Sequence, residues 1–285
     1  ALQALIKDPA RRPDFVVGTS IGAINGAMLA ADPTPAGVDR LAHIWRSARR
    51  SDVYPGRRIQ LARRLMRGAD SLYSQRPLRD MCTRAMLPHL KTFGDLQLPL
   101  YVTTATLNSY TLYIWGEDRS AALIDAIVAS ASLPVAFPPI EHRGYQYVDG
   151  GLVANLPLQV AIEKGATEIY ALDVSFSTQL LPPARGVLGV LNRAISIMLH
   201  QQSLRELELA IQRPGVTLHH LQLRGYKDLK WGDFSKTAEM IERGRREAYA
   251  YLQRPAPNTI AHDGPPPPPP PGASIFAPKK RPEGQ

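Results

Sequence analysis

A serine flanked by two glycines is the residue best suited to covalent chemistry in this chain. The pattern Gly-x-Ser-x-Gly occurs at residues 18–22, with Ser20 between Gly18 and Gly22. Glycines at these spacings remove side chains that would clash in a tight turn. The run Phe15-Val16-Val17 before it predicts a buried strand, and the small residues 21–31 after it predict a helix packed closely on a sheet. This context favours Ser20 as a nucleophile at the positive end of a helix, although a helix start capped by serine also fits.

A serine hydroxyl needs a base, and an aspartate between a predicted strand and a glycine turn is one candidate. Asp149 ends the strand pattern 145–148 and precedes Gly150 and Gly151. It therefore lies at the carboxyl edge of a sheet, where the sites of parallel α/β proteins collect. The two glycines allow its carboxylate to approach another backbone closely. An Asp-Gly turn is common in itself.

Other bases remain open at this point. Asp125 and Asp173 could compete with Asp149, but no glycine follows either of them. In a Ser–Asp–His triad, a carboxylate and then a histidine follow the serine. His219 and His220 are the adjacent pair that would supply such an imidazole, and strand alternation allows at most one of them to face inward. Their double replacement by alanine would abolish a triad esterase and spare a Ser–Asp pair.

The elements that must position these residues alternate along the first ~250 residues. Helical patterns cover residues 21–31, 37–49, 57–67, 77–90, 121–131, 156–164, 187–212 and 236–252. Strand patterns cover residues 15–17, 100–105, 111–115, 145–148, 169–174 and 216–223. This alternation predicts an α/β fold, with a mainly parallel sheet flanked by helices on both faces.

The composition of the C-terminal end differs from the rest of the chain. Residues 254–285 hold 11 of the 26 prolines, including an unbroken run from Pro265 to Pro271. Such a run favours polyproline II and does not enter a hydrophobic core. We therefore expect one domain over residues 1–253 and a disordered proline-rich tail over residues 254–285.

The net charge of +9 arises largely from one segment, because residues 40–68 contain nine arginines and a single acid, Asp52. A helix over 57–67 places Arg63, Arg64 and Arg67 opposite its apolar side. With Arg57, these side chains suit the surface of an anionic membrane, although a solvated helix that covers the core fits as well. Nucleic acid is not expected as a partner, because the segment lacks interleaved aromatic residues.

Several classes of protein are excluded by simple counts. The single cysteine, Cys82, cannot form a disulfide framework or a multi-cysteine zinc site. Neither a metal-ligand cluster nor a phosphate-binding loop is visible, so no cofactor is expected. No apolar stretch reaches the ~18 residues of a membrane span, and no signal-peptide pattern is present. We expect a cytoplasmic protein that contacts membranes peripherally.

Four segments in the same order resemble the patatin-like phospholipase family. Residues 18–26 resemble its nucleophile segment, and Asp149-Gly150-Gly151 resembles its second catalytic element. Residues 130–139 resemble its Ser-rich and Pro-rich segment, and residues 155–157 also fit. The resemblance implies a three-layer α/β sandwich and a lipid acyl hydrolase with a catalytic dyad.

The resemblance also implies a role for each member of that dyad. Ser20 would form an acyl-enzyme, and Asp149 would accept its proton. Because an ordinary aspartate is a weak base, we expect Asp149 to be partly desolvated and within hydrogen-bond reach of Ser20.

One departure from the family pattern concerns the oxyanion hole. The family has a glycine-rich loop before the nucleophile, whereas no glycine precedes Gly18 here. The family's first strand is missing as well, and the backbone N–H of Ile21 is the one donor that can be named. We expect a fragment of a longer active protein; the alternative is an impaired or non-catalytic module that binds lipid or protein.

Overall fold

The structure is a computed structural model that describes residues 1–56, 66–174, 183–223 and 232–260. Most of the predicted arginine-rich helix, including Arg57, Arg63 and Arg64, lies outside the described residues, and so does most of the predicted tail. Arg67 is described and is exposed.

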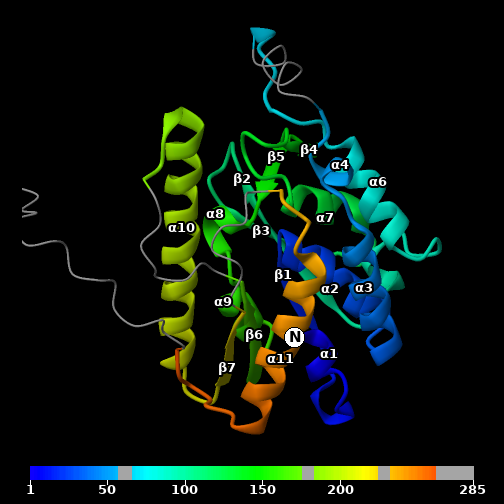
Figure 1. Ribbon diagram of the computed structural model, residues 1–285, viewed down its shortest axis with the longest axis vertical. Coiled ribbons are helices and arrows are strands. Elements are labelled where there is room, and N and C mark those ends of the chain that lie inside the picture. Colours follow the sequence, from blue (N-terminus) through cyan, green and yellow to red (C-terminus); the bar gives the residue numbers. More distant parts are fainter. Residues whose placement is uncertain (57–65, 175–182, 224–231, 261–285) are drawn as a thin grey trace, which may run out of the picture.

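Two sheets form the centre of the molecule (Figure 1). The first has five strands: β1 (Val16–Thr19), β2 (Leu100–Thr106), β3 (Leu112–Trp115), β4 (Ile140–His142) and β5 (Tyr145–Asp149). The second has two strands: β6 (Glu168–Asp173) and β7 (Thr217–Gln222). The pairs β1–β2 and β6–β7 are parallel, whereas β2–β3, β2–β5 and β4–β5 are antiparallel.

Strand β2 pairs with two different strands along one of its edges. Val102 and Thr103 pair with both β1 and β3, so β1 and β3 lie on opposite edges of β2. Thr104 and Ala105 pair with both β3 and β5, so β5 lies on the same edge as β1. Strands β1 and β5 therefore meet end to end, with Thr19 opposite Thr103 and Asp149 opposite Thr104.

The prediction of a mainly parallel sheet is wrong, because three of the five strand pairings that the structure describes are antiparallel. The connections β2–β3 and β4–β5 are too short for a crossover helix, so each folds back as a hairpin.

Helices cover both sides of these sheets, which confirms the predicted α/β class (Figure 1). One group comprises α2 (Ile21–Ala31), α3 (Pro35–Ser47), α4 (Arg50–Val53), α6 (Arg76–Ala85) and α7 (Leu123–Ser130). The other comprises α8 (Gly151–Ala154), α9 (Leu158–Glu163) and α10 (Gly186–Ile211). The short α1 (Leu2–Leu5) packs beside α11 (Thr237–Gln253), as Figure 1 shows.

Strand β1 carries side chains into two separate cores. Val16 packs against the core beneath α2, whereas Val17 packs against the core formed by α9, α10, β6 and β7. This follows from the alternation of side chains along a strand. Helix α2 approaches β1 closely, because a Cβ on Gly26 would lie 3.0 Å from Val16. The small residues predicted to allow close packing have that function here.

The element boundaries differ from the predicted ones where a proline intervenes. Helix α6 ends at Ala85, and Met86 is already extended, although the pattern predicted a helix to residue 90. Pro88 accounts for the earlier end, because a proline disfavours helical backbone before it. Two short elements next to strand β5, the strand β4 and the helix α8, were not predicted.

Candidate active site

Ser20 occupies a strained turn between β1 and α2. Its φ of 56° and ψ of −123° lie in a region that residues with a side chain rarely adopt. The strand ends at Thr19 and the helix begins at Ile21, so the turn consists of Ser20 alone. This is the strand–turn–helix geometry that the sequence predicted around the Gly-x-Ser-x-Gly pattern.

The two glycines of this pattern have different functions. A Cβ on Gly18 would lie 2.5 Å from the carbonyl oxygen of Gly22, so the backbone fills the space that a side chain needs. A Cβ on Gly22 would meet no atom within 4 Å. The expectation that both glycines remove a side-chain clash is therefore wrong for Gly22, whose backbone is instead what crowds Gly18.

Asp149 lies at the end of β5, directly beside Ser20. The hydroxyl of Ser20 donates a 2.6 Å hydrogen bond to Asp149 Oδ2, and the backbone N–H of Gly151 donates a 2.8 Å hydrogen bond to Oδ1. The residue is 5% exposed. Burial raises the pKa of Asp149 to about 6, although both hydrogen bonds act in the opposite direction. The expected proximity and desolvation are both present.

The glycines after Asp149 permit close contacts. A Cβ on Gly150 would clash with the carbonyl oxygen of Thr103, and one on Gly151 would lie 2.9 Å from Leu199 of α10. The position of Gly150 therefore requires glycine because backbone fills the space, as expected, whereas a side chain at 151 would displace the movable end of Leu199. The turn holds Asp149 between the central strand β2 and helix α10.

Ser130, at the end of α7, connects the nucleophile turn to strand β2. Its Oγ accepts a 2.8 Å hydrogen bond from the backbone N–H of Ser20 and donates a 2.8 Å hydrogen bond to the carbonyl of Thr103. The side chain is fully buried. Sequence reasoning noted Ser130 only as part of a family-like segment and missed this positioning function.

A second serine of the same segment positions Asp149 through its backbone. The carbonyl of Ser132 accepts a 3.0 Å hydrogen bond from the N–H of Asp149. The Ser132 hydroxyl donates to the carbonyl of Val128 and accepts from Gln75 Nε2, at 2.6 and 2.7 Å. Gln75 also donates to the carbonyl of Pro138, at 2.6 Å. The Ser-x-Ser spacing at 130–132 is the one signal that could have indicated both supports.

The alternative bases are engaged elsewhere. Asp125 forms an ion pair with Arg79 at 2.6 Å. His220 Nε2 lies 3.1 Å from Asp173 Oδ2, and both side chains are buried. His219 stacks on the ring of Tyr170. In the described part of the chain, the hydroxyl of Ser20 is hydrogen-bonded to a carboxylate and to no histidine.

The expectation that at most one of the two adjacent histidines faces inward is wrong. His219 is 8% exposed and His220 is 3% exposed. Strand β7 contacts α10 and α11, so elements cover its surroundings on more than one side. Both imidazoles are therefore enclosed, even though they alternate along the strand.

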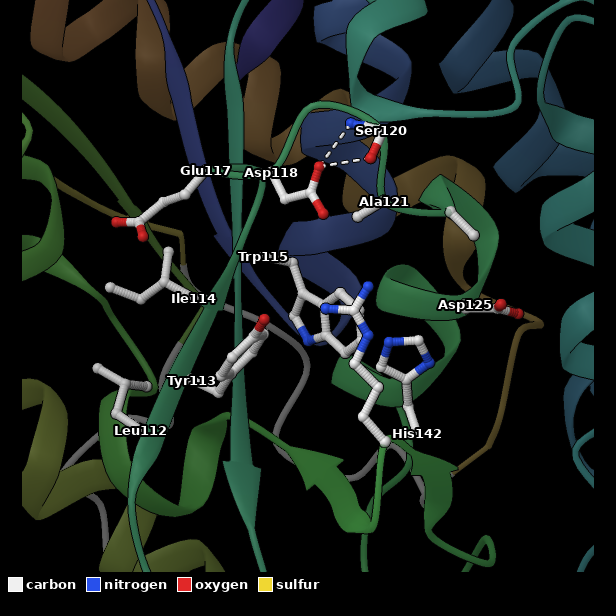
Figure 2. A pocket seen from close by; sticks show the side chains of 13 residues that line it. Leu112, Tyr113, Ile114, Trp115, Glu117, Asp118, Ser120, Ala121, Asp125 and His142 are labelled. Carbon is white, nitrogen blue, oxygen red and sulfur yellow. Dashed lines mark hydrogen bonds between the residues drawn. The ribbon is translucent and has the colours of Figure 1, made fainter.

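A cavity of about 450 Å³ lies along β3, apart from the Ser20–Asp149 pair (Figure 2). Trp115 and His142 line it, and Asp118 accepts hydrogen bonds from Ser120 at its rim. Neither Ser20 nor Asp149 is among its lining residues. This cavity is therefore separate from the Ser20–Asp149 pair.

Other chemistry-bearing features are few within the described residues. Burial raises the pKa of the Cys82 thiol to about 12, so the thiol is neutral and enclosed in the core. No three His, Cys, Asp or Glu side chains of the described ranges converge in a way that could hold a metal ion. Over the same ranges, no helix has both the length and the apolar character needed to cross a bilayer.

Comparisons with known proteins give the class of this molecule. The sequence profile of the patatin-like phospholipases matches residues 1–162, and the chain belongs to this family. Lysophospholipase NTE1 of Mycosarcoma maydis is 26% identical over 183 residues, which cover 61% of this chain and 9% of that protein. Patatin-like phospholipase domain-containing protein 6 of Mus musculus is 26% identical over 163 residues, covering 56% and 11%.

The chain spans about a tenth of the length of these two relatives. Among solved structures, VipD from Legionella pneumophila aligns with 88% of this chain and 64% of its own, with a TM-score of 0.46 and 14% identity. The family and its lysophospholipase members support lipid ester hydrolysis at the level of the family.

Proposed function

We propose that this chain hydrolyses lipid acyl esters through a Ser20 acyl-enzyme, with Asp149 as the general base. The observation that carries the proposal is the 2.6 Å hydrogen bond from the Ser20 hydroxyl to a buried carboxylate. A pKa of about 6 leaves Asp149 ionised at neutral pH, yet makes it a stronger base than an exposed aspartate.

The reaction has two stages, and in each of them Asp149 takes up one proton and returns it. Asp149 Oδ2 takes the proton of Ser20 as Oγ attacks the ester carbonyl, and it returns that proton to the leaving alcohol. Water then attacks the acyl-enzyme and gives a proton to Asp149; as the bond between Ser20 Oγ and the acyl carbon breaks, Asp149 returns this proton to Oγ and the fatty acid departs. The Oδ1 atom keeps its hydrogen bond from Gly151, which holds the carboxylate in place.

The oxyanion that forms in each step needs hydrogen-bond donors. Ile21 is the first residue of α2, so its backbone N–H has no acceptor within the helix. We propose this N–H as one donor, aided by the positive end of α2. Gly18 contributes indirectly, because it lets the chain turn tightly enough to present Ser20.

We also propose that the domain continues through α11, beyond the 162 residues that match the family. Ala248 of α11 is fully buried and packs in one cluster with Ala4 and Leu221. This contact joins the start of the chain to its last described helix. Limited proteolysis that leaves residues 1–253 as one resistant fragment supports this boundary, whereas a resistant fragment ending near residue 162 contradicts it.

An anionic membrane surface is the proposed location of the substrate. The arginine-rich segment supports this proposal through its charge, and Arg67 is exposed. Hydrolysis of anionic vesicles should fall steeply with added salt, whereas hydrolysis of a soluble short-chain ester should not. An equal response of both substrates to salt contradicts a contribution of these arginines.

Labelling with a fluorophosphonate probe tests the nucleophile. We expect Ser20 to be labelled in the full-length protein, and Ser20→Ala to abolish the label. Ser120→Ala is the matched control. This serine is exposed, and its hydroxyl donates a hydrogen bond to Asp118 rather than to Asp149. Absence of labelling in the unmodified chain, or labelling that survives Ser20→Ala, contradicts the proposal and favours a non-catalytic lipid-binding module.

A further inference from the structure

Helix α10 exposes an apolar stripe where a surface helix normally exposes polar residues. Val187 is 84% exposed, and Val190 and Ile197 are each 56% exposed. The full stripe comprises Val187, Val190, Leu191, Ala194, Ile197 and Met198. At 3.6 residues per turn, these positions form one band roughly 120° wide. Six apolar side chains over three turns form a continuous patch rather than scattered exposure.

The stripe is opposite the face by which α10 packs on the protein. Leu199 lies against Gly151, and Asn155 Nδ2 donates a 2.8 Å hydrogen bond to Ser203 Oγ. Further along the same inner face, Leu207 and Ala210 are fully buried. Folding therefore does not require the outer face to be apolar, because the inner face already supplies the contacts with the core.

The exposed apolar residues are concentrated in the N-terminal half of the helix, and Leu209, which is 45% exposed, is the large apolar side chain exposed in the C-terminal half. From residue 201 onward, the outer face becomes mainly polar and exposes Gln201, Arg205, Glu208 and Gln212. An outer face that is polar in one half of the helix and apolar in the other indicates that a binding partner covers the apolar half. Figure 1 shows α10 along one outer side of the molecule, where a large partner has access to it.

The charges on α10 indicate an anionic partner. Residues 186–205 contain no acidic residue, whereas Arg185, Arg193 and Arg205 lie at or within this range. A helical segment with an apolar face and only basic charges, such as residues 186–205, lies well in the interface of an anionic bilayer, because its arginines reach the headgroups. The acidic residues of α10, Glu206 and Glu208, lie beyond this segment.

We infer that the stripe on α10 is a docking surface for an anionic phospholipid bilayer. This inference rests on the proposed function, because docking matters for hydrolysis only if the Ser20–Asp149 pair is catalytic. Helix α10 packs against the turn that follows Asp149, through the contact of Leu199 with Gly151. The stripe is about one helix diameter, ~10 Å, from that turn. Docking through α10 therefore holds the proposed Ser20–Asp149 pair about one helix diameter from the lipid surface that holds the substrate, with α10 between them.

A fluorescent probe on the stripe tests this inference without disturbing the fold. Cys82 is the only cysteine and is fully buried, so a thiol-reactive probe will react with Met198→Cys. We expect a blue shift of the probe's emission when vesicles of equal parts phosphatidylcholine and phosphatidylglycerol are added to the full chain. Gln212→Cys, at the polar end, is the control and should show none. Equal responses at both positions, or no response at 198, overturn the inference.

Charge substitutions provide a second measurement. The double variant Val190→Glu with Ile197→Glu should weaken vesicle binding about tenfold or more, because carboxylates then face lipid. Gln201→Glu adds a carboxylate to the same face beyond the stripe and should change binding less than about twofold. Unchanged binding of the double variant overturns the inference. So does a dimer of the unmodified chain that the double variant dissociates, since the stripe is then an interface between copies.

Two readouts separate this inference from the proposed function. Ser20→Ala should bind the same vesicles as the unmodified chain, and the stripe variants should hydrolyse a soluble short-chain ester normally. If vesicle binding requires the stripe but no ester is hydrolysed, the hydrolase proposal fails and the docking surface stands. If the soluble ester is hydrolysed but vesicles do not bind, only the docking surface fails.

Discussion

Replacing Asp149 by asparagine should stabilise the protein while removing its activity. Burial raises the pKa of Asp149 from 3.8 to about 6, so the folded chain retains this proton to higher pH than the unfolded chain does. Ionised Asp149 therefore opposes folding at neutral pH. A difference of roughly two pKa units corresponds to about 3 kcal/mol of unfolding free energy, at 1.36 kcal/mol per unit.

Because folding raises the pKa of Asp149, its carboxylate destabilises the fold only at pH values where the unfolded chain has lost this proton. Below about pH 3.8, the carboxyl group is protonated in both states and costs nothing. The penalty develops between about pH 4 and pH 6 and stays constant above. Asparagine is neutral throughout and can still accept the hydrogen bond that Gly151 donates to Oδ1. Asp149→Asn should thus be more stable than the unmodified chain by up to about 3 kcal/mol at pH 8, and nearly equal to it at pH 4.

Urea unfolding at pH 4 and pH 8 measures this difference, and fluorophosphonate labelling measures activity. Labelling should fall by about 10² to 10⁴, the usual contribution of a general base. Asp125→Asn is the matched control, because its carboxylate is partly exposed and paired with Arg79; it should change stability by about 1 kcal/mol or less. An Asp149→Asn variant that is less stable at pH 8, or whose difference is the same at both pH values, would refute the reasoning.

Three further predictions follow from the same contacts. Hydrolysis of a soluble ester should fall about tenfold per pH unit below about pH 6, since protonated Asp149 cannot act as base; half-maximal activity near pH 4 would contradict this. Ser130→Ala removes the hydroxyl that bonds to the Ser20 N–H and to the Thr103 carbonyl. The variant should lower the free energy of unfolding by about 1–3 kcal/mol and fluorophosphonate labelling about tenfold. Unchanged labelling would show that Ser130 has no positioning function. Gly18→Ala should destabilise the fold by about 1–3 kcal/mol in urea unfolding, whereas Gly22→Ala, which has open space, should cost about 0.5 kcal/mol or less.

The two residues of the pair, Ser20 and Asp149, could each be recognised in the sequence because both carry local signals. A glycine pattern after a strand marks one residue, and an Asp-Gly-Gly turn after another strand marks the other. Their proximity follows from the pairing of β1 and β5 with one edge of β2, which no local pattern contains. The resemblance to a family supplied what the residues alone left open.

The residues that position Ser20 and Asp149 could not be predicted in the same way. Ser130, Ser132 and Gln75 act through hydrogen bonds to residues far away in the chain, so their functions depend on tertiary contacts. The outer face of α10 was overlooked for a different reason. From sequence alone, a long helix with apolar residues on all sides is expected to be buried. Only the tertiary contacts show which of its sides is covered.

The end-to-end junction of β1 and β5 on β2 has a consequence for how freely the rest of the molecule can vary. Ser20 and Asp149 are 129 residues apart, yet backbone pairing to neighbouring positions of one strand fixes their separation. Insertions between these strands can lengthen or remodel the intervening loops without moving the two oxygens. A slip of either strand by a single residue, by contrast, shifts its group ~3.3 Å along β2 and turns the side chain to the opposite side of the sheet.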